Sequence, residues 1–161
     1  MWTRRTFHEC ASELGSISIE FRAAHRTGQL QIMIDTSERG VEVLRILALS
    51  IRSDEDYGHT QIGTTQVGIL RSRVTALEVR DTIRDYRPPY KALAGYAPLT
   101  LRLALNKIAH ADPAQSGFFA DEQTHDLILS GTDKGSTWLA IISVIDLCNV
   151  VQSLPDRRNQ T

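Results

Sequence analysis

The apolar residues in the first third of the chain recur at intervals of three and four, which is typical of one face of a helix. Over residues 3–26 these positions are Phe7, Cys10, Leu14, Ile17 and Phe21. The same spacing in Val43, Leu44, Leu47 and Ile51 predicts a second helix that ends near residue 52. Residues 29–35 fit a strand as well as a helix, so the pattern leaves that segment open.

The middle of the chain alternates polar connectors with helical patterns. Residues 53–65 are polar and contain glycine, which indicates a loop. Apolar positions over 66–86 predict another helix, and Pro88 ends it because the residue before a proline is disfavoured in helical geometry. Pro98 then suits the first turn of a helix that reaches about Ala111.

The last third has a different pattern. Two runs rich in β-forming residues flank a turn that contains Gly131 and Gly135, which predicts a β-hairpin over about 126–145. A short final helix follows, and residues 155–161 are expected to fray. A lone hairpin is marginal in water, so it must dock on something, and Trp138 suits that role.

These elements predict a mainly α protein of the α+β class. The expected architecture is a four- to five-helix bundle with one C-terminal β-hairpin, at about 126–145, and a short final helix. Residues 1–161 would form a single helical domain, with the bundle over 3–112 and the hairpin plus terminal helix over 124–154.

Composition narrows the class of protein. Hydrophobic residues make up 42% of the chain and charged residues 23%, as in ordinary globular domains. The net charge of −1 excludes a global basic excess that would drive non-specific nucleic-acid binding. Cys10 and Cys148 are far apart and in no metal-binding motif, so we expect no metal and no cofactor. No segment has the length of a membrane span or the pattern of a signal peptide, so we expect no membrane partner and a cytoplasmic location.

Residues 101–110 carry the most suggestive chemistry. On a helix, one apolar face is formed by Leu101, Ala104, Leu105 and Ile108. Arg102, Asn106 and His110 step by four residues and form a second stripe beside that face. Imidazole can transfer a proton near neutral pH and guanidinium can hold a phosphate, so this stripe suits RNA cleavage.

The segment Leu105-Asn106-Lys107-Ile108-Ala109-His110-Ala111, within residues 99–112, resembles the catalytic helix of HEPN-type domains. These are small helical-bundle proteins, many of them dimeric ribonucleases. The resemblance implies that Arg102 and His110 are a catalytic pair and that Asn106 is a polar helper. The seven residues between Arg102 and His110 exceed the spacing of the family motif.

Two functional hypotheses follow. The first is a small intracellular protein that acts through protein contacts as a homodimer, with the apolar hairpin residues Trp138, Ile141 and Ile142 at the interface. The alternative is a HEPN-like, metal-independent ribonuclease or RNA-binding protein that uses Arg102, Asn106 and His110.

Each candidate polar group also has a purely structural interpretation. Arg102 can pair with an acid such as Asp121 or Glu122. The acidic residues 54–56 with His59 can bind a divalent cation, but a solvated loop is the commoner outcome for such a run.

Overall fold

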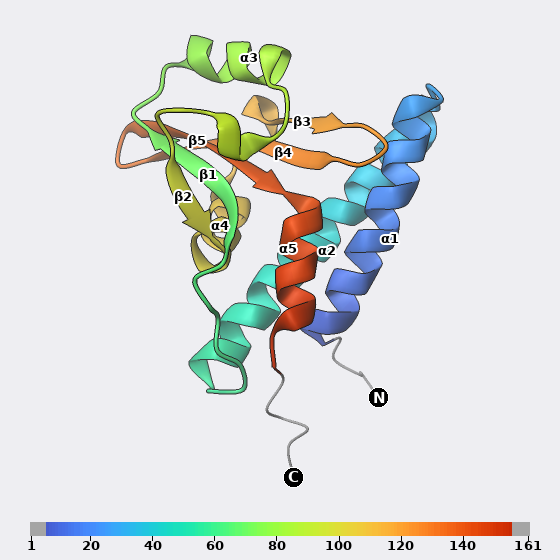
Figure 1. The fold of residues 1–161 in the computed structure, drawn as a ribbon, viewed down its shortest axis with the longest axis vertical. Coiled ribbons are helices and arrows are strands. Elements are labelled where there is room, and N and C mark those ends of the chain that lie inside the picture. Colours follow the sequence, from blue (N-terminus) through green and yellow to red (C-terminus); the bar gives the residue numbers. More distant parts are fainter. Residues whose placement is uncertain (1–5, 156–161) are drawn as a thin grey trace.

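The structure, a computed structural model, describes residues 6–155. It opens with a helical hairpin of α1 (Phe7–Arg26) and α2 (Leu30–Asp56), whose two long helices pack against each other (Figure 1). The Thr6 side chain accepts a hydrogen bond from the Glu9 N–H and begins α1. Gly28, with a positive φ of 69°, makes the turn between the helices. The open segment 29–35 is therefore helical apart from Gln29, and the expected loop at 53–65 starts only after residue 56.

A five-stranded antiparallel sheet occupies the other part of the molecule, with strand order β2-β1-β5-β4-β3 (Figure 1). Its strands are β1 (Gln66–Ser72), β2 (Ala97–Thr100), β3 (Gly117–Ala120), β4 (His125–Asp133) and β5 (Ser136–Ser143). Lys134 and Gly135 join β4 to β5, both with positive φ, as a type I′ hairpin turn requires.

Helices cover both faces of this sheet. On one face, α1 and α2 pack together with α4 (Leu101–His110) and α5 (Val144–Ser153). The other face carries α3 (Ala76–Asp85) and the short 3-10 turn η1 (Tyr90–Ala92). A second 3-10 turn, η2 (Pro113–Gln115), links α4 to β3. Figure 1 shows α3 above the sheet, on the side away from α4.

The predicted helical bundle with a single hairpin is wrong, because the hairpin is part of a five-stranded sheet. The predicted hairpin and final helix do form, as β4–β5 and α5. The bundle expected over 3–112 is not a separate unit, since β1 and β2 come from that segment and β1 pairs with β5. The chain therefore has an α+β fold in which strands from both halves share one sheet.

The helix predicted over 66–86 is strand β1 followed by α3. Val67 faces the larger core and Ile69 faces the smaller one, so both faces of β1 are buried. Gly68 lets β1 approach β5 closely, because a Cβ there would lie 2.2 Å from the Ile141 carbonyl oxygen. Apolar residues on both faces of a strand break the alternation by which strands are usually recognised.

Three shorter segments of the chain were also predicted differently or not predicted at all. Pro98 lies in β2, the edge strand, and α4 begins three residues later at Leu101. The short strand β3 was not predicted. The tail expected to fray, 155–161, falls outside the described residues except for its first position.

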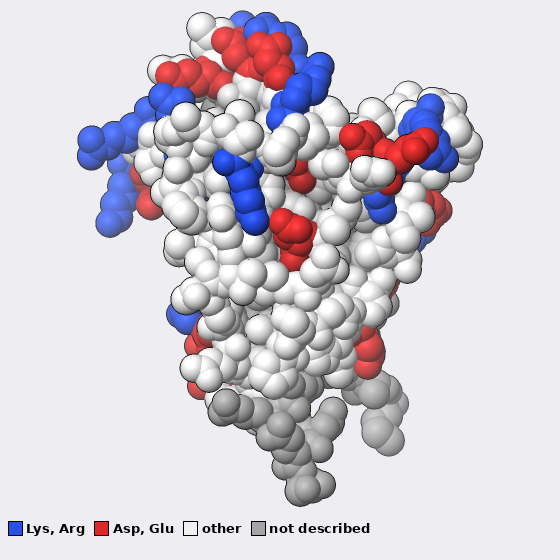
Figure 2. Space-filling view, in the orientation of Figure 1, with Lys and Arg blue, Asp and Glu red and all other residues white. Residues whose placement is uncertain are grey.

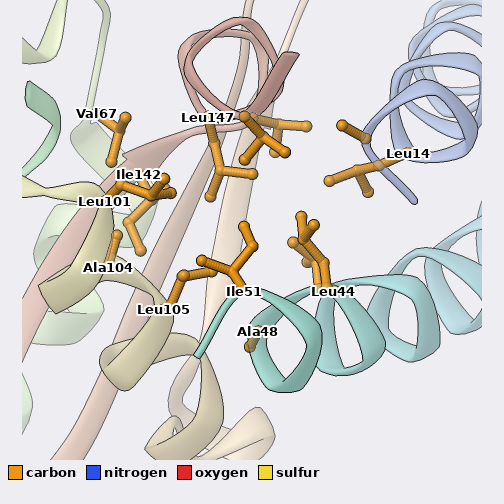
Figure 3. Packing of buried hydrophobic residues seen from close by; sticks show 14 of the residues in the cluster. Leu14, Leu44, Ala48, Ile51, Val67, Leu101, Ala104, Leu105, Ile142 and Leu147 are labelled. Atoms are coloured by element: carbon orange, nitrogen blue, oxygen red, sulfur yellow. The ribbon is translucent and has the colours of Figure 1, made fainter. Parts of the chain in front are cut away.

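The larger core lies between the sheet and the four helices. Figure 3 shows Leu101, Ala104 and Leu105 pointing from α4 toward a cluster that contains Ile51 of α2 and Ile142 of β5. The three α4 side chains are fully buried, as their spacing predicted. Among residues 6–155, no helix combines the length and hydrophobicity that crossing a bilayer requires.

Candidate functional site

A cavity of about 270 Å³ lies between the α1–α2 hairpin and the β3–β4 edge of the sheet. Helix α2 packs on α1 and α4, and the cavity separates it from β3 and β4. Protein interiors rarely contain spaces much larger than a water molecule. This one approaches the size range of small-molecule sites, and it is more enclosed than the shallower hollow beside it.

Aliphatic side chains from several elements line the cavity. Leu14 and Ile17 come from α1, Leu44 from α2, and Leu127 and Leu129 from β4. The two β4 leucines are only half-buried, although their strand lies inside the sheet. Their remaining exposure is explained by the cavity that they face.

One polar pair lies in this apolar wall. Ser18 of α1 and His125 of β4 share a hydrogen bond of 2.7 Å between Oγ and Nδ1. Ser18 is 2% exposed and His125 9% exposed. The Phe21 ring stacks parallel to the imidazole, with the ring centroids 5.0 Å apart.

Burial lowers the pKa of His125 from its ordinary value of 6.5 to about 4, and the positive charges of Arg22 and His25 act in the same direction. The imidazole is therefore neutral at pH 7. A neutral imidazole bonded to a serine is a polar group without charge, which an apolar cavity can hold at little cost.

Aromatic rings stand at the mouth of the cavity. Phe118 of β3 packs edge-on against Phe21, with centroids 4.9 Å apart, and edge-on against His25 at 5.5 Å. A second, shallower hollow continues from this point along α2, and it shares Phe21, Ser37 and Phe118 with the cavity. Phe21 and Phe118 therefore border both the cavity and the shallower hollow.

The serine–histidine pair is not a catalytic triad. Asp126 follows His125 in β4, so its side chain points to the opposite face of the sheet. There the Asp126 carboxylate accepts a hydrogen bond from the Tyr86 hydroxyl at 2.5 Å, and burial raises the pKa of Asp126. Within residues 6–155, no carboxylate orients the His125 ring by a hydrogen bond. A histidine whose pKa is near 4 is also too weak a base to activate a serine near neutral pH.

The residues that the sequence singled out for RNA chemistry lie elsewhere, on the outer side of α4. Arg102, Asn106 and His110 are all exposed. The Arg102 guanidinium forms an ion pair with Glu55 at the end of α2, and not with Asp121 or Glu122. Arg102 and His110 are eight positions apart along α4, a rise of roughly 12 Å, so within one chain they do not meet at the same phosphate.

The hairpin residues expected at a dimer interface are buried inside the chain. Trp138 is 3% exposed, and Ile141 and Ile142 are 0% exposed. They lie on β5, the central strand, and helices cover both faces of the sheet at that point. The predicted hairpin interface is therefore wrong, while self-association itself stays a prediction.

The acidic segment does not form a metal site. Asp54 is buried at the end of α2, Glu55 pairs with Arg102, and His59 follows the helix. The described residues contain no cluster of three or more groups that could hold a metal ion. Figure 2 shows acidic and basic side chains near one another in the upper part of one face, with mostly uncharged surface below them.

The sequence pattern did not identify the cavity residues as a site. Ser18 and His125 are 107 positions apart, and each alone looks like an ordinary polar residue beside an apolar pattern.

Comparisons with protein-family models, with curated proteins and with solved structures found no match for this chain.

Proposed function

We propose that this protein binds a small, mainly apolar molecule in the cavity between the α1–α2 hairpin and β3–β4. The observation that carries the proposal is the cavity itself, about 270 Å³ of space with a mainly apolar lining. An apolar cavity of about 150 Å³ is enough to bind benzene. Burial of hydrocarbon in this larger space would supply the main free energy of binding.

The polar groups of the cavity favour binding over catalysis. The hydrogen bond between Ser18 Oγ and His125 Nδ1 keeps both of these atoms partnered when an apolar ligand binds. The low pKa of His125 keeps it uncharged at neutral pH. A ligand with a hydrocarbon body can therefore bind without leaving a buried charge unpaired.

The test is a titration with octan-1-ol, followed by the methyl resonances of the isotopically labelled protein. We expect saturable shifts at Leu127 and Leu129, which face the cavity. Val79 and Ile83, which pack on the other face of the sheet, are the internal reference. Shifts of equal size on both faces, or no saturable shift at Leu127 and Leu129, would refute the proposal.

RNA cleavage is the second candidate, and one observation favours it: Arg102, Asn106 and His110 are all exposed in one row on α4. Because a single chain does not bring Arg102 and His110 together, this hypothesis also needs a second copy of the chain. Incubation of RNA with the wild type and with His110→Ala tests it. We would abandon the hypothesis if the two proteins cleave equally or if neither cleaves.

A further inference from the structure

Among the described residues that line the cavity, one is permanently charged, Arg45 of α2. Its side chain is exposed and lies at the rim, near Val41 and Ser37, which are exposed on the same helix. Within residues 6–155, no carboxylate forms an ion pair with Arg45. The neighbouring arginine on this helix, Arg39, differs because it pairs with Glu20.

Taking the proposed function as its basis, we infer that the ligand is a small monocarboxylic acid whose alkyl chain fills the cavity and whose carboxylate binds Arg45. A guanidinium can hold a carboxylate through two parallel hydrogen bonds, which a lone hydroxyl or amine cannot match. The apolar walls below the rim then receive the chain.

The charges around the opening set the orientation of this ligand. The shallower hollow along α2 has an acidic residue, Glu38, in its lining, which repels a carboxylate placed there. None of the described residues that line the cavity proper is acidic. The acid therefore places its head at Arg45 and its chain between α1 and β4, toward Leu14 and Leu127.

The volume of the cavity limits the length of the chain. Scaled from the cavity of about 150 Å³ that holds benzene, a space of this size takes a ligand of about eleven non-hydrogen atoms. Octanoate, with about ten, meets this limit. A long-chain fatty acid does not fit in the cavity alone.

Three probes with the same chain and different heads test the inference: octanoate, octan-1-ol and octylammonium, each titrated calorimetrically into the full chain. In the wild type we expect octanoate to bind about five-fold more tightly than octan-1-ol, since a largely exposed ion pair contributes up to about 1 kcal/mol. Octylammonium should bind most weakly, and added salt should reduce the preference for octanoate.

Arg45→Gln should bring the ratio of the octanoate and octan-1-ol dissociation constants to about one. Arg39→Gln, the matched control on the same helix, should keep the wild-type ratio. The inference is overturned if wild type binds octanoate no better than octan-1-ol, or if Arg45→Gln retains the preference. If octan-1-ol binds and the three probes have equal affinities, only this inference is refuted. If none of the three probes binds, the proposed function is refuted as well.

Discussion

At the scale of single residues, the most informative groups are polar side chains buried in apolar surroundings. His125 is bonded to Ser18 and stays neutral, and Asp126 beside it is bonded to Tyr86 on the opposite face of the sheet. Adjacent positions of one strand thus hold two titratable groups in two separate environments. Their contributions to stability can be measured separately.

Acidification should destabilise the protein through His125. The folded pKa of about 4 lies below the ordinary value of 6.5, so between these values the unfolded chain takes up a proton that the folded protein does not bind. Stability should therefore fall as the pH is lowered from 6.5 to 4, by up to about 3 kcal/mol from this residue. Urea unfolding of the wild type and of His125→Asn at pH 7 and pH 4.5 measures the effect. A pH dependence that is unchanged in the variant would contradict it.

Tyr86→Phe should destabilise the protein by about 1–3 kcal/mol, because it leaves the buried Asp126 carboxylate without its hydroxyl donor. Tyr90→Phe is the matched control. Tyr90 donates to Asp146 at 2.8 Å, and Asp146 is only half-buried, so water can replace the lost bond. Chemical denaturation of both variants gives the comparison, and a larger loss in Tyr90→Phe would show that burial does not decide the cost.

At the scale of elements, the sequence predicts well where one face of an element is apolar. Helix α1, the second half of α2, the buried face of α4 and the β4–β5 hairpin follow from spacing and turn chemistry. Strand β1 is missed because Val67, Leu70 and Val74 also fit a helical spacing. Strands β2 and β3 have four residues each, which is too few to show a period.

Helices α3 and α4 differ in their N-caps. Thr75 begins α3 in a capping box with Glu78, whereas Thr100 begins α4 without a side-chain hydrogen bond. Thr75→Ala should therefore lower the free energy of unfolding by about 1 kcal/mol. Thr100→Ala removes no cap bond and should cost less. Equal losses in thermal or urea unfolding would argue against the capping explanation.

At the scale of the whole molecule, the candidate site is a space between the α1–α2 hairpin and the sheet. The α1–α2 hairpin contacts α4 and α5, which pack on the sheet, but a gap is left beside the edge strand β3 and its neighbour β4. Ser18 and His125, which are 107 positions apart in the sequence, come together there. A local pattern carries no information about such a contact, so the cavity could not be predicted, whereas the exposed row on α4 could.

Filling the cavity tests the account most directly. Gly40 lines it, and a Cβ there would meet its nearest described neighbour, Ile17 Cγ2, at an ordinary 3.5 Å. Gly40→Leu should therefore fold, with helix α2 stabilised by replacement of its glycine. Gly15→Leu, a matched change on α1 with nothing within 4 Å of the new Cβ, is the control because Gly15 does not line the cavity.

The deciding measurement is the calorimetric affinity for octan-1-ol of Gly40→Leu beside that of Gly15→Leu and the wild type. The account predicts that Gly40→Leu remains folded and loses at least about ten-fold in affinity, since its side chain takes the space of the ligand. Gly15→Leu should bind as the wild type does. Undiminished binding by a folded Gly40→Leu would contradict the assignment of the cavity as the binding site.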